Sequence, residues 1–172
     1  AYIPLRLATP EQVEDLKRKD QTLETASDSI GSSFTYQFED KRFLLAEDNE
    51  INAMIVIELL ARRGAAVDRA DNGEAVVERF RSMPAGTYDA ILMDIQMPVL
   101  NGWEAAERIR ALEREDAAAI PIIALSANDY TEDVERSRRA GMNGHVGKPI
   151  DLNVLKAQLA AATAEAAYRG NE

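Results

Sequence analysis

The sequence predicts an α/β fold of three layers, with a parallel sheet lying between two layers of helices. From about residue 42 onward, short apolar runs alternate with longer segments of helical periodicity, which is the pattern of repeated βα units. The runs read as buried strands, as expected when helices cover both sides of a sheet. The 172 residues, with 46% hydrophobic content, suffice for one such domain and an appendage.

The strands are expected at the apolar runs, which are residues 42–46, 66–70, 90–93, 120–125 and 145–147. In the fourth run Pro121 comes early, which suits the first residues of a strand better than its middle. Right-handed crossovers between parallel strands leave few ways to wind these units. We therefore expect a three-layer, flavodoxin-like sandwich with a five-stranded parallel sheet of order 2-1-3-4-5.

Helical segments follow the runs. The first is expected to end at Gly64, the second begins after the turn Asp71-Asn72-Gly73, and the fourth, a charged one, extends from about Thr131 to Gly141. The apolar residues at helical spacing in the other helices are Ile51, Met54, Ile55 and Leu59; Val76, Val77 and Phe80; Ala105, Ile109 and Leu112; and Leu152, Leu155 and Leu159.

The domain limits are expected at residues 42 and 165. Residues 1–41 differ in character and are assigned to a linker, in which a capping box at Thr9 favours a helix from Pro10 to about Thr25. Residues 166–172 are assigned to a tail.

Charge and composition exclude several classes of function. The chain has 30 acidic and 20 basic residues and a formal charge of −10, which argues against binding of nucleic acid or anionic lipid. It contains no cysteine, so disulfides and thiolate sites are excluded, and no apolar stretch approaches membrane-spanning length. We expect a cytoplasmic location without direct membrane contact in this segment, which leaves open a membrane-attached parent chain.

Polar side chains follow four of the predicted strands: Glu47 and Asp48, Asp94, Ser126, and Lys148. Because parallel strands end at one edge of a sheet, these side chains should converge there. Two carboxylates at about 4 Å repel each other by roughly 4 kcal/mol at an effective dielectric near 20, so a cation is expected among them. Mg²⁺, or Mn²⁺ in its place, prefers such oxygen ligands. The alternative is that Glu47 and Asp48 merely cap the following helix.

Asp94 is the candidate nucleophile of this site. An ionised carboxylate can attack phosphorus directly to form an aspartyl-phosphate, and it needs no general base. The metal would polarise the phosphoryl group, while Lys148 and the Ser126 hydroxyl balance and hydrogen-bond its oxygens.

Four motifs carry a resemblance to a known family: Leu44-Leu45-Ala46-Glu47-Asp48-Asn49, Met93-Asp94-Ile95-Gln96-Met97-Pro98 with Asn101-Gly102, Leu125-Ser126-Ala127, and Gly147-Lys148-Pro149. From about Lys41 to Ala162 the chain resembles the receiver domain of two-component response regulators. The resemblance implies that Asp94 accepts phosphate from a phosphohistidine. It also implies that Glu47 and Asp48, with the Gln96 backbone carbonyl, hold Mg²⁺, and that Lys148 contacts the phosphoryl group.

The resemblance assigns further roles. Ser126 occupies the position of the switch hydroxyl, a cis peptide is expected at Lys148-Pro149, and Gln96 and Asn128 tune the lifetime of the phosphorylated state. His145, the only histidine, stands at the position of the aromatic switch residue, where the family usually has Tyr or Phe. This departure puts the usual coupling of hydroxyl and aromatic ring in doubt.

The resemblance also points to a hybrid sensor histidine kinase as the parent chain. Residues 1–5 resemble the closing strand of a kinase ATP-binding domain, and the Asp-Ile-Gln-Met-Pro variant looks like receivers of hybrid kinases. The partners implied are a histidine kinase domain, a histidine phosphotransfer protein, or both. By itself this segment would catalyse only its own phosphorylation and dephosphorylation. The signal would reach the face carrying the last two helices and the last strand.

Two other functions stay open. A phosphatase with an aspartyl-phosphate intermediate would want a second aspartate where Gln96 stands. A phosphorylation-independent docking module, regulating an attached kinase, would have no use for the acidic pair, Asp94 and Lys148. Two remaining features receive structural interpretations: Trp103 as a packing or partner-contact residue, and residues 113–116 as a solvated face.

Overall fold

The computed structural model describes residues 38–127 and 131–169, and it confirms the predicted α/β fold. A five-stranded parallel sheet has the order β2-β1-β3-β4-β5. Its strands are β1 (Arg42–Ala46), β2 (Ala66–Ala70), β3 (Ala90–Asp94), β4 (Ile122–Ser126) and β5 (Gly144–Gly147). The expected helix in residues 10–25 lies outside the described residues.

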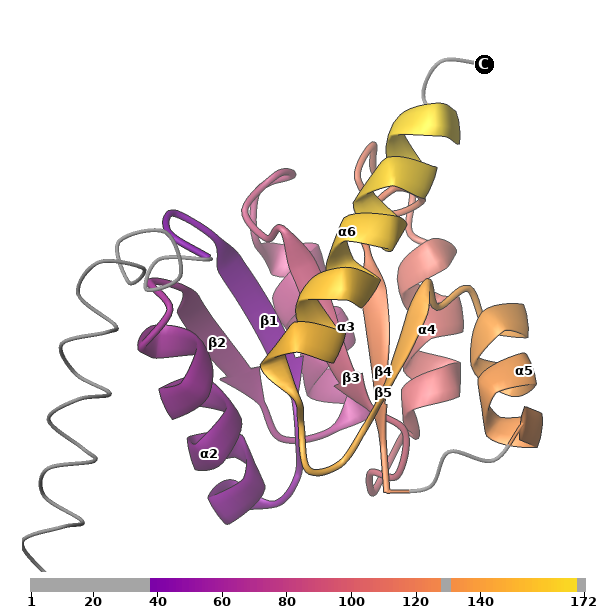
Figure 1. Cartoon of the computed structure of the whole chain (residues 1–172). Helices are drawn as coiled ribbons and strands as arrows, with labels where there is room; N and C mark the ends of the chain where they lie inside the picture. Colours follow the sequence, from indigo (N-terminus) through magenta and orange to yellow (C-terminus); the bar gives the residue numbers. More distant parts are fainter. Residues whose placement is uncertain (1–37, 128–130, 170–172) are drawn as a thin grey trace, which may run out of the picture. The chain divides into compact units, whose positions relative to one another are not determined.

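Two layers of helices cover the sheet (Figure 1). The helices are α2 (Glu50–Ala61), α3 (Gly73–Ser82), α4 (Gly102–Arg110), α5 (Thr131–Arg139) and α6 (Leu152–Arg169). Helices α2 and α6 pack on one face of the sheet, where Leu60 and Leu155 are fully buried. Helices α3 and α4 pack on the other face around Phe80 and Ile109. None of the helices in the described part of the chain is long and apolar enough to cross a bilayer.

Three helices that follow the carboxyl ends of strands begin with the same asparagine cap. The side chains of Asn49, Asn72 and Asn101 each accept a hydrogen bond from the backbone N–H three residues later. This cap satisfies one of the backbone donors left unpaired at a helix start. Gly64 and Gly141, with φ of 89° and 96°, end the helical turns before β2 and β5 as expected.

Two glycines allow the loop after β3 to lie against the rest of the fold. A Cβ atom on Gly102 would lie 2.3 Å from the Asp94 carbonyl oxygen, and one on Gly73 would lie 2.1 Å from the Leu100 carbonyl oxygen. Neither position has room for a larger residue. The tight packing fixes the backbone immediately after Asp94.

Of the four apolar residues expected at helical spacing in α2, three are exposed and only Leu59 is half-buried. Ile51, Met54 and Ile55 are 69%, 63% and 54% exposed, whereas the residues that pack on the sheet are Ala53, Val56 and Leu60. Because α2 is apolar on nearly every side, its sequence contains two apolar stripes. The stripe that is buried in the structure is that of Ala53, Val56 and Leu60.

The prediction of a solvated face at residues 113–116 is wrong for two of its members. The side chains of Arg114 and Asp116 are 14% and 18% exposed. The Arg114 guanidinium lies 4.2 Å from the centre of the Phe80 ring and donates to the Met83 carbonyl at 3.0 Å. Although burial alone would raise the pKa of Asp116, its hydrogen bond from Arg114 lowers it.

Some boundaries differ from the expected ones. Strand β4 begins at Ile122, after Pro121, whose carbonyl accepts the Ile91 N–H at 2.8 Å but which has no N–H to donate. Phe38 is buried and packs edge-on against Phe43 at 5.5 Å, and the compact unit begins at Phe38. Helix α6 runs on to Arg169.

Candidate functional site

The predicted site residues lie at the carboxyl ends of the strands. Ala46 of β1 pairs with Met93 of β3, so Glu47 and Asp94 follow neighbouring positions at the same edge. The backbone of Glu47 continues the pairing with β2, because its N–H donates to the Ala70 carbonyl at 3.1 Å. The register of the sheet therefore places the acidic residues side by side.

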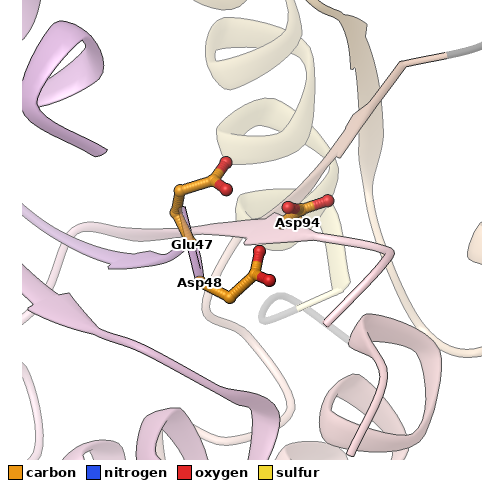
Figure 2. A group of neighbouring side chains, drawn as sticks. All are labelled: Glu47, Asp48 and Asp94. Carbon is orange, nitrogen blue, oxygen red and sulfur yellow. The ribbon is translucent and has the colours of Figure 1, made fainter. Parts of the chain in front are cut away.

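The three carboxylates converge. Figure 2 shows Glu47 and Asp48 at the end of β1, with their carboxyl groups on the same side as that of Asp94. Each offers an oxygen atom, and these atoms lie within 4.8 Å of one another. Glu47 and Asp94 are 1% and 5% exposed, while Asp48 is exposed to solvent. Two buried negative charges at this separation require a cation.

Lys148 supplies one positive charge. Its Nζ donates to Glu47 Oε2 at 2.7 Å and to Asp94 Oδ2 at 3.0 Å. The other oxygens of both carboxylates accept backbone N–H groups, Glu47 Oε1 from Asn49 and Asp94 Oδ1 from Gln96, each at 3.1 Å. Within the described part of the chain, no group donates to the Asp48 carboxylate. Asp48 is therefore the acid most open to a ligand.

Asp94 and Lys148 shift each other's pKa. Burial raises the pKa of Asp94 to about 6, and the nearby Glu47 contributes, while the hydrogen bond from Lys148 acts in the opposite direction. Burial alone would lower the pKa of Lys148, but its hydrogen bonds to Glu47 and Asp94 outweigh burial and raise it. At neutral pH Lys148 is charged, and Asp94 is ionised at a cost that a second cation would reduce.

The arrangement fits a divalent cation. Within the described residues, the three carboxylates have the Lys148 ammonium group and the guanidinium of Arg69 near them, which still leaves excess negative charge at neutral pH. All the offered atoms are hard oxygens, which suit Mg²⁺ better than softer metals. The unengaged carboxylate of Asp48, beside Asp94, gives such an ion a place to bind.

The other predicted residues lie around this group. Ser126 is buried at the end of β4, and its carbonyl accepts the Lys148 N–H at 2.8 Å. The Lys148-Pro149 peptide is cis. His145 is half-buried in β5 and pairs with Ala124, and Gln96 is exposed beside Asp94. Asn128 lies outside the described residues.

Sequence reasoning missed Arg69, the next-to-last residue of β2. Its guanidinium donates to the backbone carbonyls of Glu47 and Asp48, both at 3.2 Å. The only signal in the sequence was a basic residue near the end of a predicted strand. It missed Asn49 as well, whose side chain caps α2 and whose N–H binds Glu47.

Comparisons with known proteins agree with this geometry. The model of the response regulator receiver domain family matches residues 43–160. The two-component response regulator ORR41 of Oryza sativa subsp. japonica is 40% identical over 121 residues, which are 69% of this chain and 91% of that protein. Hybrid signal transduction histidine kinase I of Dictyostelium discoideum is 37% identical over 117 residues, 67% of this chain. The chain spans only 7% of the length of that kinase.

Solved structures show the same fold. The receiver domain of sensor histidine kinase PA1611 from Pseudomonas aeruginosa PAO1, with a magnesium ion coordinated in its active site cleft, is 35% identical with a TM-score of 0.63. That match covers 72% of this chain and 98% of the other. A co-crystal of the Saccharomyces cerevisiae phosphotransfer protein Ypd1 with the receiver domain of Ssk1 matches at 30% identity and a TM-score of 0.64, over 75% and 93% of the two chains.

The matched region contains all five strands except Arg42, the first residue of β1, and all the acidic residues of the site, and it extends over more than half of the chain. On fold, motif order and sequence, this chain belongs to the response regulator receiver domain family of two-component and phosphorelay signalling.

Proposed function

We propose that Asp94 is the phosphoacceptor of this receiver domain and that its phosphorylation switches a protein-binding face. The observation that carries the proposal is the contact of Lys148 Nζ with both Glu47 and Asp94, beside the open carboxylate of Asp48. A nucleophile, an anion-binding ammonium group and a candidate cation ligand thus meet at one edge of the sheet.

The chemistry follows from these positions. An ionised oxygen of Asp94 attacks the phosphorus of a phosphohistidine, an O–P bond forms, and the P–N bond breaks with its electrons left on the imidazole. Lys148 neutralises charge on the transferred phosphoryl oxygens, and the Ser126 hydroxyl is assigned to donate a hydrogen bond to one of them. Asp48 and Asp94, with Glu47 and the Gln96 carbonyl, would hold Mg²⁺, or Mn²⁺ in its place. When bound, the metal supplies Lewis-acid polarisation of the phosphoryl group.

A protein is the phosphodonor that the surface beside the site fits best. The side chains of Ile51, Met54 and Ile55 on α2, which begins two residues after Asp48, and of Val99 in the loop after β3 present apolar surface to solvent. A small phosphodonor would leave this surface uncovered. We assign it to a histidine phosphotransfer protein or the phosphoacceptor domain of a histidine kinase, in keeping with the Ypd1 complex of the yeast relative.

The parent chain is proposed to be a cytoplasmic or membrane-attached hybrid histidine kinase, in which residues 42–165 are the receiver and residues 1–41 its linker. Long hybrid kinases among the relatives support this origin. The switched face would be that of α5, β5 and α6, where Val134 and Val154 are 40% and 43% exposed. Gln96 and Asn128 remain assigned to tuning of dephosphorylation.

The test is phosphorylation with a small acyl phosphate and Mg²⁺, followed by intact mass and peptide mapping. Wild type should gain one phosphoryl group, Asp94→Asn should gain none, and Asp71→Asn, which changes an exposed aspartate, should behave as wild type. Label on any other residue, or equal labelling of Asp94→Asn, contradicts the proposal. Partner binding that is the same with and without phosphodonor would favour the docking module.

A further inference from the structure

We propose that Arg69 is a positioning residue for the cation-binding acids Glu47 and Asp48, an inference that rests on the proposed function. Arg69 lies on β2, opposite Leu45 of β1 in the register of the sheet. From there its Nε and one terminal nitrogen bind the carbonyl oxygens of two consecutive residues, Glu47 and Asp48, both at 3.2 Å. The planar guanidinium can span two acceptors in this way, and a lysine ammonium cannot hold both in the same geometry.

The turn after β1 is held by these two hydrogen bonds from Arg69. The Glu47 N–H is held by the Ala70 carbonyl, and the Glu47 side chain is held by Lys148 and the Asn49 N–H. For Asp48, by contrast, the hydrogen bond found within residues 38–127 and 131–169 reaches only its carbonyl, and it comes from Arg69. The backbone sets the direction in which the exposed side chain of Asp48 leaves the chain, and Arg69 is the side chain that binds that backbone.

Charge and geometry make opposite predictions for this residue. The positive charge of Arg69 repels a divalent cation nearby, so if charge were all that mattered, removing it would strengthen Mg²⁺ binding. If Arg69 positions the acids, a substitution should weaken binding, because misplaced ligands lose affinity. Outer partners that orient metal ligands typically change affinity by about 10- to 100-fold.

The experiment measures the Mg²⁺ dissociation constant by isothermal titration calorimetry at constant ionic strength, on wild type, Arg69→Lys and Arg62→Lys. Arg69→Lys keeps the positive charge but loses the paired hydrogen bonds to the carbonyls of Glu47 and Asp48. The Mg²⁺ dissociation constant of this variant should therefore rise about 10-fold. Arg62 pairs with Glu58 on the exposed surface of α2, and Arg62→Lys should match wild type. Saturating Mg²⁺ should restore the phosphorylation rate of Arg69→Lys, because the defect lies in cation binding.

Melting curves from circular dichroism will show whether Arg69→Lys is folded. If Arg69→Lys is unfolded, the Mg²⁺ dissociation constant of Arg69→Gln is measured in its place and judged by the same limit. A dissociation constant within twofold of wild type, or a lower one, overturns the inference. If wild type itself binds no Mg²⁺ and takes up no phosphate, the proposed function fails. If wild type does both and the Arg69 variant binds Mg²⁺ equally well, only the role of Arg69 fails.

Discussion

The ammonium group of Lys148 lies 3.0 Å from Oδ2 of Asp94, although 54 positions separate the two residues in the chain. The same nitrogen lies 2.7 Å from Glu47 Oε2. Three strand ends thus contribute to one ionic group, in which a buried acid keeps a raised pKa and a lysine stays charged. The stability of the fold and the reactivity of the site are linked through these charges.

Replacing Asp94 with Asn should stabilise the protein in a pH-dependent way when no divalent cation is present. The folded-state pKa of Asp94, about 6, lies above the ordinary value of 3.8, so ionisation costs folding free energy. The cost is absent below about pH 4, grows as the pH rises toward 6, and is constant above. A pKa difference of about two corresponds to about 3 kcal/mol, which sets the upper size of the gain.

Urea unfolding at several pH values between 4 and 8 measures this effect. The difference in unfolding free energy between Asp94→Asn and wild type should grow over the window from about 4 to about 6 and then level off. Asp71→Asn, at an exposed position, is the matched control. A difference for Asp94→Asn that stays constant with pH would refute the raised pKa.

Lys148→Met should have the opposite effect on stability. Without the ammonium group, Glu47 and Asp94 face each other with no cation, and removing one partner of a buried ion pair typically costs about 3 to 5 kcal/mol. The pKa of Asp94 should rise further, so lowering the pH to 5 protonates it and recovers part of the loss. Unfolding free energies at pH 7.5 and pH 5 test this, with Lys156→Met on the exposed side of α6 as control. An equal loss of unfolding free energy at both pH values would contradict the role of Lys148 in offsetting the charges of Glu47 and Asp94.

Gly102→Ala should destabilise the protein by about 2 kcal/mol through overpacking. The added methyl group would meet the Asp94 carbonyl oxygen at 2.3 Å and the Ile95 Cα at 2.9 Å, and neither is a flexible side chain. Gly86→Ala is the comparison, because its methyl group meets nothing within 4 Å and only its φ of 82° is unfavourable. We expect Gly102→Ala to lose more unfolding free energy than Gly86→Ala, as measured by chemical denaturation. Equal losses would mean that close backbone approach is unimportant there.

Trp103 should couple energetically to Ser137. The indole N–H donates to the Ser137 hydroxyl at 3.0 Å, and Arg136 lies 3.9 Å above the indole ring. Ser137 is the buried residue of α5, so these contacts attach a highly charged helix to α4. A double-mutant cycle of Trp103→Phe and Ser137→Ala should give a coupling of about 1 kcal/mol, and Trp103→Phe should speed amide exchange in α5. A coupling indistinguishable from zero would rule out the attachment.

Local pattern predicted much of the fold and of the site. The apolar runs predicted the strands because parallel strands buried on both faces have to be continuously apolar. Crossover handedness left few possible strand orders, and the expected flavodoxin-like order is the one observed. The acids after β1 and β3 and the lysine after β5 could be expected to meet because carboxyl ends share one edge.

The sequence by itself therefore determined the fold class, the strand order and the residue types gathered at the edge of the sheet. Only the tertiary structure decided which apolar stripe of α2 is buried, that Arg114 stacks on Phe80, and that Arg69 binds the carbonyls of Glu47 and Asp48. The physical reason is that periodicity reports which residues could share a face. The partner of a long polar side chain depends instead on distances between elements far apart in the chain.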